Sequence, residues 1–493
     1  MAGVKSLAKD TAVYGLSSIV GRFLNWCLVP LYTSLFLPDE YGVVTFVYTV
    51  VALALIILTY GMETGFFRFA NHDRWKDPME VYSTALISLA VSSSAFVVGV
   101  CAFAEPISNV MECGGHSSYV VIMAVCVAID AFLALPYSYL RYCKRPIRFA
   151  VIRLINIGVN IGLNLFFLLL CPWLMNHSSA TVSWFYIPDF GIGYIFLSNL
   201  IASAVNFVMM MPELRGFKWK FNRQLWREML RYSAPLLVLG LAGIMNQTVD
   251  KLLYPSLAPD KADAMSGLGI YGANYKIAIV MVMFIQAFRF AYEPFIFAQA
   301  REKGDSKNQA YADAMKYFII FGLLIFMGVM FYLDILKYFI SPDYFSGLKV
   351  VPLIMLAELF FGIFFNLSLW YKLTDKTVWG MWFSLFGLAI TVVLNIVLVP
   401  HYDYMGCAVA ALCSYGAMML VSYFIGRSQY PISYPLRRIG AYFLLAAVIY
   451  GLGMYVLPLS GIAAYAVRAI LLIVFLAVVA HTEKLSLSSL LRR

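Results

Sequence analysis

The sequence predicts an all-α integral membrane protein with about fourteen transmembrane helices. Of its 493 residues, 62% are hydrophobic and only 13% are charged, whereas soluble globular chains are about half apolar and a quarter charged. A soluble fold cannot bury so much apolar surface, so the solvent of this chain must be lipid. The apolar residues also fall into separate runs of about 20 residues or more, the length that an α-helix needs to cross the hydrocarbon core.

The spans follow from reading the apolar runs between charged breaks and breaks marked by Pro or Gly. The first six helices and the next eight are separated by the longest basic loop. The predicted spans lie near residues 12–36, 43–67, 81–104, 118–140, 151–173, 191–211, 231–255, 269–297, 317–337, 350–371, 377–399, 405–426, 439–457 and 463–481.

The distribution of Lys and Arg orients these helices. Of the 36 cations, 28 fall in loops and termini on one side of the alternating topology, and only Lys261, Lys337 and Lys349 fall on the other. The remaining five lie inside predicted spans. Because cytoplasmic loops are rich in Lys and Arg, the basic side is predicted to be cytoplasmic, and so are both termini. The net charge of +10 therefore indicates basic cytoplasmic loops and not a nucleic-acid partner.

Enzymatic and cofactor motifs are missing from the sequence. The N-terminal MAGVKSLAKD leads into the first apolar run without a small-residue cleavage site, which predicts a retained helix and not a signal peptide. The eight cysteines form no CxxC pair and the five histidines are scattered, so we expect neither a metal site nor a cofactor. No nucleotide-binding or hydrolase motif is present. We therefore expect a transporter driven by a gradient, not an enzyme.

An internal repeat predicts two lobes. Tyr41-Gly42 recurs as Tyr271-Gly272, and Asn164 recurs as Asn395, at offsets close to 230 residues. Parallel repeats of this kind are a transporter architecture with the substrate path between the halves. The predicted regions are an N-terminal six-helix lobe (1–211), a cytoplasmic amphipathic linker (212–231), a C-terminal six-helix lobe (232–427), and two additional helices with a short cytoplasmic tail (428–493). The linker is expected to lie as an interfacial helix on the anionic inner leaflet.

Four cations at membrane depth are candidate substrate-binding residues: Arg22, Lys251, Lys276 and Arg289. A charge at the helix centre costs about 2.5 kcal/mol or more unless it faces water or a partner. Arg22 is near the middle of its span, where it could line a wet cavity and face an anionic substrate, or could pair with Glu63 or Asp130. The two lysines are nearer the outer surface, where long stems can reach water. Arg289 could instead pair with Glu293, four residues on.

Three acids are candidates for ion coupling or for charge balance: Glu63, Asp130 and Glu358. Asp130 and Glu358 are central in the fourth and tenth spans, which are equivalent members of the two predicted lobes. Each could bind a coupling proton or Na⁺, or could only neutralise nearby cations. Asp250 is adjacent to Lys251, and because neighbouring residues on a helix are about 100° apart, its side chain is expected on a different face. Arg468, in the last span, is expected to be structural.

Several loose motifs resemble the multidrug/oligosaccharidyl-lipid/polysaccharide (MOP) superfamily, and within it the Wzx-type flippases for lipid-linked oligosaccharides. The resemblance covers the chain from end to end. Its motifs are the helix from Tyr14-Gly15 to Arg22, the turn Leu37-Pro38-Asp39-Glu40-Tyr41-Gly42, the segment Gly61-Met62-Glu63-Thr64, residues Asn160 to Asn164 with their echo at Asn395, and Tyr404-Met405-Gly406-Cys407-Ala408.

This resemblance implies a MATE-like fold of two six-helix lobes that works by alternating access in the bacterial inner membrane. The implied cargo is an undecaprenyl-diphosphate carrying an oligosaccharide repeat unit for O-antigen, capsule or other surface polysaccharide. The expected partners are that lipid, membrane lipids and other polysaccharide assembly proteins. Two alternatives stay open: an ion-coupled drug or cation antiporter of the same superfamily, and a membrane-embedded glycan polymerase or ligase.

Overall fold

The computed structural model is built of helices, as the sequence predicts. Thirteen helical segments in the described part of the chain are long and apolar enough to cross a membrane, and they match the second to fourteenth predicted spans. The first predicted span lies partly outside the described residues, although residues 19–26 are helical. The structure describes residues 15–484 except residues 18, 73, 76, 114, 178–181, 218, 300–305, 375, 377 and 457–460.

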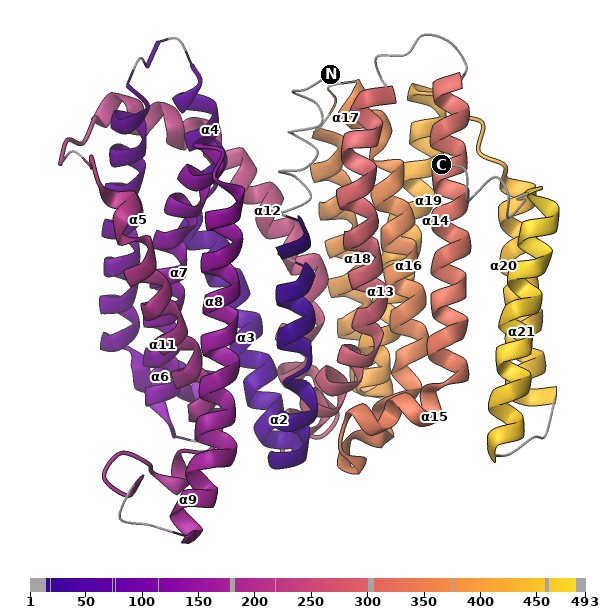
Figure 1. Cartoon of the computed structure of the whole chain (residues 1–493), viewed down its shortest axis with the longest axis horizontal. Helices are drawn as coiled ribbons and strands as arrows, with labels where there is room; N and C mark the ends of the chain where they lie inside the picture. Colours follow the sequence, from indigo (N-terminus) through magenta and orange to yellow (C-terminus); the bar gives the residue numbers. More distant parts are fainter. Residues whose placement is uncertain are drawn as a thin grey trace. The chain divides into compact units, whose positions relative to one another are not determined.

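The helices are labelled in Figure 1 in chain order. Short 3₁₀ or π segments, labelled η, interrupt or connect several of them. The elements are α2 (Val29–Leu35), α3 (Pro38–Thr59), α4 (Met62–Ala70), α5 (Pro78–Ala102), α6 (Ala104–Val110), α7 (Ser117–Tyr142), α8 (Pro146–Leu165), η1 (Phe166–Leu170), α9 (Cys171–His177), η2 (Pro188–Phe190), α11 (Gly193–Met210), η3 (Met211–Leu214), α12 (Arg223–Leu257), α13 (Ala264–Gln299), α14 (Ser306–Phe331), α15 (Leu333–Leu336), η4 (Lys337–Phe339), η5 (Pro342–Val350), α16 (Val351–Leu367), α17 (Leu369–Leu373), α18 (Val378–Tyr402), α19 (Tyr404–Gln429), α20 (Leu436–Gly451), η6 (Leu452–Val456) and α21 (Gly461–Thr482).

The chain packs into two compact units. The first unit contains Met1–Ala273 and Ser384–Cys407, and the second contains Asn274–Phe383 and Ala408–Arg493. The helices α13, α18 and α19 therefore each contribute residues to both units. The predicted lobes at 1–211 and 232–427, and the orientation of the termini, stay predictions.

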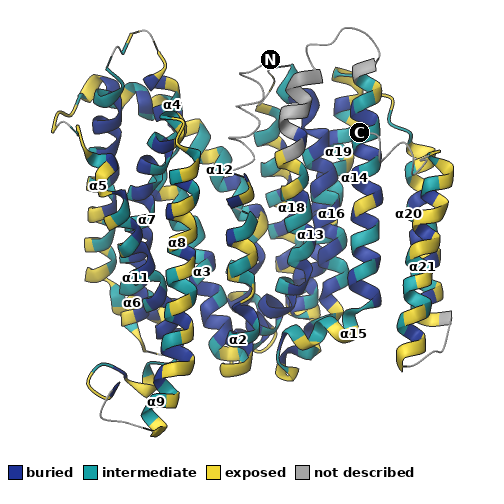
Figure 2. Ribbon diagram, viewed as in Figure 1, coloured by how far each residue is buried: buried dark blue, intermediate teal, exposed yellow. Residues whose placement is uncertain are grey.

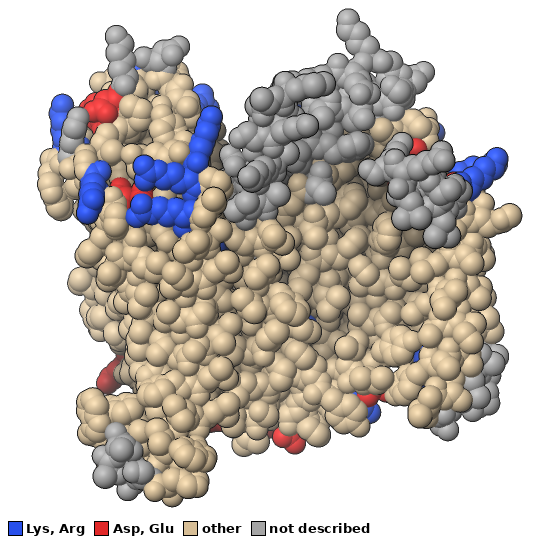
Figure 3. Space-filling view, in the orientation of Figure 1, with Lys and Arg blue, Asp and Glu red and all other residues tan. Residues whose placement is uncertain are grey.

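Charged residues gather at one end of the first unit. Figure 3 shows Lys and Arg side chains at the end that carries α4, next to a broad belt of uncharged surface. Arg145 and Arg148 lie 3.7 and 2.9 Å from the carboxylate of Glu213, which is only 3% exposed. This basic end is the one predicted to be cytoplasmic, because the positive-inside rule places Lys and Arg there.

The turn before α3 is fixed by local hydrogen bonding. The backbone N–H of Leu37 donates to the Glu40 carboxylate at 3.0 Å, and Pro38 occupies the first helical position, where its missing N–H costs nothing. At the other end, Tyr60 (φ 31°) and Gly61 (φ 74°) take left-handed conformations. The second predicted span is therefore two helices, α3 and α4, joined by this break.

The predicted amphipathic linker is not a separate interfacial helix. Asn222 caps α12 by accepting the backbone N–H groups of Gln224 and Leu225, and α12 then runs for 35 residues. The second half of the linker is thus the start of a membrane-spanning helix. Leu225 and Met229 are fully buried in a core with residues of α4 and α5, which explains why the helix continues instead of ending at the membrane surface.

The two copies of the repeat meet closely in the first unit. A Cβ atom at Gly269 would overlap the carbonyl oxygen of Pro38, and one at Gly42 would overlap that of Met265. Small residues allow helix backbones to approach in this way in membranes. Asn164 and Asn395 also match, since each is fully buried and donates to the carbonyl four residues earlier, at 2.8 and 2.7 Å.

The helices α20 and α21 contact α14 of the second unit at two levels along its length. Much of their surface is exposed in Figure 2, and only 17% of the apolar window of α21 is buried, against 67% for α14. At one level, Glu483 lies 2.5 Å from Lys316 and accepts the Tyr442 hydroxyl at 2.6 Å. At the other, Arg468 donates to the carbonyl oxygens of Phe331 and Gly453 at 2.8 and 3.3 Å. The structural role predicted for Arg468 fits these contacts.

We expect Gly269→Ala to destabilise the protein and Gly158→Ala to leave its stability unchanged or slightly raised. The added methyl group at position 269 meets a backbone carbonyl that cannot move aside, at a cost of about 1–3 kcal/mol. At position 158 nothing lies within 4 Å, and Ala favours the helix by up to about 1 kcal/mol over Gly. Thermal unfolding of the purified protein in detergent measures both, and equal melting temperatures would contradict the close crossing.

We expect Glu483→Gln to lower stability by about 3 kcal/mol, because it leaves buried Lys316 without its closest counter-charge. Burial by itself would raise the pKa of Glu483, but hydrogen bonds from Lys316 and Tyr442 and the charges of Lys316 and Arg438 outweigh it and hold that pKa below its ordinary value.

The contribution of Glu483 is therefore complete above its unfolded pKa of about 4.3 and is lost as the pH falls through the lower folded value. Thermal unfolding between pH 7 and pH 3 should show a larger loss for the wild type than for Glu483→Gln. The matched control is Asp313→Asn, which removes the half-exposed partner of Lys316. Identical pH profiles for the wild type and Glu483→Gln would exclude this role.

Candidate functional site: charged groups at membrane depth

Two cations lie over a single aromatic ring in the second unit. The Arg289 guanidinium carbon, on α13, is 3.8 Å from the centroid of Phe365, and Lys372 Nζ, on α17, is 4.4 Å from it. Both distances are within the range of cation–π attraction. The side chain of Arg289 is exposed, whereas that of Glu293, its suggested partner, lies outside the described residues. An anionic group that reached this ring would be attracted by both cations.

Lys372 is the functional candidate that sequence reasoning missed. Lys372 is one of the 28 loop and terminal cations on the predicted cytoplasmic side. Its spacing of seven from Phe365 would place the two residues on one side of a continuous helix. The structure interrupts that helix between α16 and α17. Arg289 comes from a different helix, so no spacing rule could have joined it to Lys372.

Glu358 is buried in α16 of the same unit. It is 5% exposed, and it accepts a hydrogen bond of 2.5 Å from the hydroxyl of Tyr275 on α13. Lys276, the next residue along α13, is half-buried. The candidate acid is therefore held by a neutral donor that stabilises a carboxylate without neutralising its charge.

Asp130 has the equivalent arrangement in the first unit. The hydroxyl of Ser203, on α11, donates to its carboxylate at 2.8 Å, and Ser203 also contacts Cys126 at 3.5 Å. Asp130 and Glu358 thus share a feature beyond their matching places in the repeat: each receives a hydroxyl from a neighbouring helix. Their role in ion coupling or charge balance stays a prediction.

Glu63 differs from the expectation of an acid deep in the second span. It is in the first turn of α4, beyond the break at Tyr60 and Gly61, and its carboxylate is 2.9 Å from Arg141 and 3.2 Å from the Ser138 hydroxyl. Both partners of the ion pair are more than a third exposed. The break at Tyr60 and Gly61 could not be predicted, because the apolar run continues through it. As a result of this break, Glu63 lies at the basic end of the unit.

Lys251 also differs from its expected environment. Its residue exposure is 9%, and its ammonium group lies 3.2 Å from the Asp250 carboxylate and 3.4 Å from the carbonyl of Gln247. Asp250 accepts a further hydrogen bond from Tyr271 at 2.7 Å. The prediction that Asp250 and Lys251 point to different faces is therefore wrong. The long lysine stem bends toward Asp250 because a buried ammonium without a counter-charge is strongly unfavourable. This contact outweighs the usual divergence of adjacent side chains on a helix.

Arg22 lies on a helical stretch of the first unit and its side chain is exposed. The acids suggested as its structural partners contact other residues, since Glu63 pairs with Arg141 and Asp130 accepts from Ser203. The role of Arg22 in facing an anionic substrate stays a prediction, as do the roles of the other three cations.

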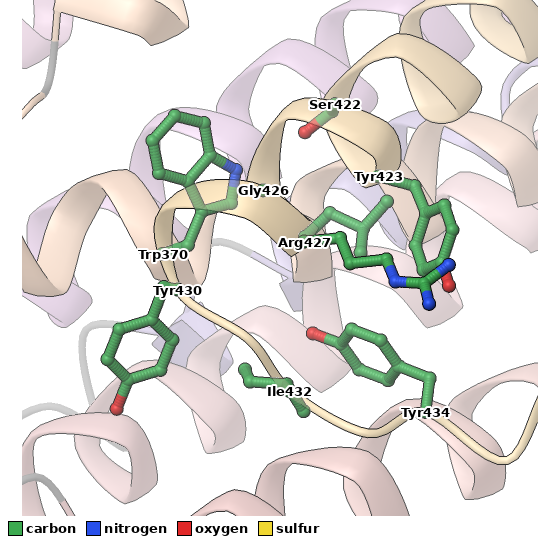
Figure 4. Close-up of a pocket in the computed structure, with 9 residues that line it drawn as sticks. Trp370, Ser422, Tyr423, Gly426, Arg427, Tyr430, Ile432 and Tyr434 are labelled. Atoms are coloured by element: carbon green, nitrogen blue, oxygen red, sulfur yellow. The ribbon is translucent and has the colours of Figure 1, made fainter.

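A small pocket in the second unit is not large enough for a substrate. Figure 4 shows it between the ends of α17 and α19, with Trp370, Tyr430 and Tyr434 around it. It leaves about 10 Å³ for the centre of a water molecule, enough for about one water. The Nε1 atom of Trp370 and the hydroxyl of Ser422 line it and have no other partner among the described residues, so a single water would satisfy both.

Comparison with known proteins gives one family match and several solved structures of similar fold. A family model described as "Polysaccharide biosynthesis protein" matches residues 7–297. No curated protein sequence matches. Among solved structures, the lipid II flippase MurJ in an inward closed conformation is similar with a TM-score of 0.71 at 15% identity, covering 96% of this chain and 99% of that one.

Multidrug transporters have the same fold. An inward-facing MATE family transporter of the MOP superfamily gives a TM-score of 0.65 at 14% identity, covering 88% of this chain and 98% of that one. The MATE multidrug transporter DinF-BH gives 0.62 at 13% identity, covering 86% and 96%. The predicted all-α, MATE-like fold and the resemblance to the MOP superfamily are confirmed.

We expect Lys251→Met to destabilise the protein strongly, because it leaves the Asp250 carboxylate buried without a counter-charge, at a cost of about 3–5 kcal/mol. The double variant Asp250→Asn with Lys251→Met removes both charges and should recover most of that loss. Thermal unfolding in detergent compares the two variants with the wild type. If the double variant is no more stable than the single one, the two charges do not depend on each other as described.

Proposed function

The chain belongs to the polysaccharide biosynthesis protein family, and we propose that it moves a polyprenyl-diphosphate-linked oligosaccharide repeat unit across the bacterial inner membrane by alternating access. The observation that carries this proposal is the family match, which spans residues 7–297. The product would supply the assembly of a surface polysaccharide such as O-antigen or capsule. Its partners would be the lipid-linked cargo, membrane lipids and other polysaccharide assembly proteins.

The chemistry of such a cargo explains why it needs a protein. A diphosphate and several sugars cannot leave water for hydrocarbon without losing many hydrogen bonds, whereas the polyprenyl tail is soluble in lipid. A transporter therefore has to offer a wet, polar path to the head while the tail stays in the membrane. Cations on that path attract a diphosphate more strongly than they would in bulk water, because the local dielectric constant is lower.

Arg289 and Lys372 are the best placed of the described cations for this task. They share the ring of Phe365, whose face attracts cations without cancelling their charge. A planar guanidinium binds two phosphate oxygens at once, and the ammonium adds a point charge. We propose that they bind the diphosphate in the second unit, and that Arg22 does so in the first.

Asp130 and Glu358 support a proposal about the energy source. Asp130 accepts a hydrogen bond from Ser203 and Glu358 accepts one from Tyr275. A bond from a neutral hydroxyl leaves the carboxylate its charge, so the group can still take up a proton or bind Na⁺. In reconstituted vesicles, transport that stops when the proton gradient or Na⁺ is removed would favour coupling through these acids. Transport that continues under both conditions would indicate facilitated movement down the cargo's own gradient.

An ion-coupled drug antiporter is the competing function, because several solved MATE transporters share the fold. Such a protein would be expected to bind cations. The positive charges of Arg289 and Lys372, which lie over the ring of Phe365, disfavour the binding of a cation there. Efflux of a cationic dye from cells that express the chain, without an effect on surface polysaccharide, would favour the antiporter. The glycan polymerase or ligase would instead change the length or attachment of the polysaccharide.

We expect Arg22→Ala and Arg289→Ala each to reduce surface polysaccharide by tenfold or more, since a charged contact to a diphosphate contributes about 1.5–3 kcal/mol. The measurement is complementation of a strain that lacks the gene, with polysaccharide quantified at the cell surface and the protein quantified in the membrane. Arg437→Ala is the control, because Arg437 is also an exposed arginine at the basic side. Export at the wild-type level in both variants would exclude the anion-binding role.

A further inference from the structure

A long apolar groove runs along the surface of the first unit. It has a volume of about 520 Å³, and it is lined by α5, by Tyr60 at the end of α3 and by the start of α12. Its residues on α5 extend from Ile87 to Ala95, a length of about 12 Å along a helix. A groove of this length and volume can hold part of one hydrocarbon chain.

The polar atoms in the groove are already satisfied. The Ser88 hydroxyl accepts the indole N–H of Trp226 at 2.7 Å and shares a hydrogen bond of 2.6 Å with the hydroxyl of Tyr60. The other hydroxyl, that of Ser92, donates to the carbonyl of Leu89 at 3.2 Å. The remaining walls are side chains such as Val91, Ala95 and Leu230. A polar ligand would find no partner there, so the groove favours an aliphatic one.

A row of arginines follows the groove along α12. Residues on a helix are about 100° apart, so α12 presents three neighbouring rows in order around its axis. Leu225 and Met229 face the core, Trp226 and Leu230 line the groove, and the next row holds Arg223, Arg227 and Arg231. All three arginines are exposed, and none has an ion-pair or hydrogen-bond partner within the part of the chain that the structure describes.

We propose that this groove binds one acyl chain of an anionic glycerophospholipid whose phosphate is held by Arg223 and Arg227. The groove supplies the apolar contact, and the arginine row supplies the charge that complements the headgroup. Trp219, at 90% exposure, is next to this row in sequence, and tryptophan is favoured at the level of lipid headgroups. Bulk phospholipid is far more concentrated in a leaflet than a carrier lipid, so mass action favours it as the occupant. This inference is independent of the transported cargo.

Native mass spectrometry of the purified full-length protein tests the proposal. The protein is incubated with palmitoyl-oleoyl phosphatidylglycerol or with phosphatidylcholine of the same acyl chains, and the retained lipid is counted. We expect one phosphatidylglycerol to be retained in preference to phosphatidylcholine. The double variant Arg223→Gln with Arg227→Gln should reduce that preference about tenfold, and Ala95→Trp, which fills the groove, should reduce retention of both lipids.

Two matched controls separate the site from general effects. Arg437→Gln removes an exposed arginine of the second unit, and Val98→Trp places a tryptophan on α5 at an exposed position outside the groove. Neither should change retention. If Ala95→Trp lowers the melting temperature, Val91→Trp takes its place. Equal retention of the two lipids by the wild type, or unchanged retention in Ala95→Trp, would overturn the proposal. So would displacement of phosphatidylglycerol by an equal concentration of polyprenyl phosphate, which would assign the groove to the cargo.

Discussion

The cost of placing a charge in hydrocarbon is the constraint on which the rest of this structure depends. Charges in the described helices meet that cost in different ways. Lys251 is next to the carboxylate of Asp250, Glu358 accepts a tyrosine hydroxyl among its contacts, and Arg468 contacts two backbone carbonyl oxygens and the carboxylate of Asp334. The contacts of Glu358 and Arg468 also join helices, and Asp250 joins α12 to α13 through the hydroxyl of Tyr271. The groups that make the chain expensive to insert therefore determine how its helices pack.

The sequence was enough to predict the helices because a single physical requirement, about 20 apolar residues to cross the membrane, repeats along the chain. It also predicted the repeat, and the matched hydrogen bonds of Asn164 and Asn395 agree with it. The break at Tyr60 and Gly61 could not be predicted, because hydropathy does not change there. The same limit applies to α12, where the core contacts of Leu225 and Met229, and not their composition, extend the helix.

The candidate site was predicted less well than the fold because it depends on which side chains meet. Arg289 was recognised as a cation at membrane depth, but its neighbour Lys372 was not, since only the folded chain brings them to Phe365. The sequence places Lys251 near the outer surface, where its stem can reach water, and the divergence of adjacent helix residues places Asp250 on a different face. A flexible four-carbon stem overrides that rule when burial makes a counter-charge necessary.

These contacts divide the candidate cations by what substrate binding would require of each. A diphosphate that approached Lys251 would have to displace Asp250 and leave that carboxylate buried, so the gain in attraction would be offset by the charge left behind. Arg289 and Lys372 interact with an aromatic face, which attracts cations without cancelling their charge, so an anion can add to that contact instead of replacing it. On this argument Lys251 is better explained as part of the packing of α12 against α13, where Asp250 also accepts the hydroxyl of Tyr271.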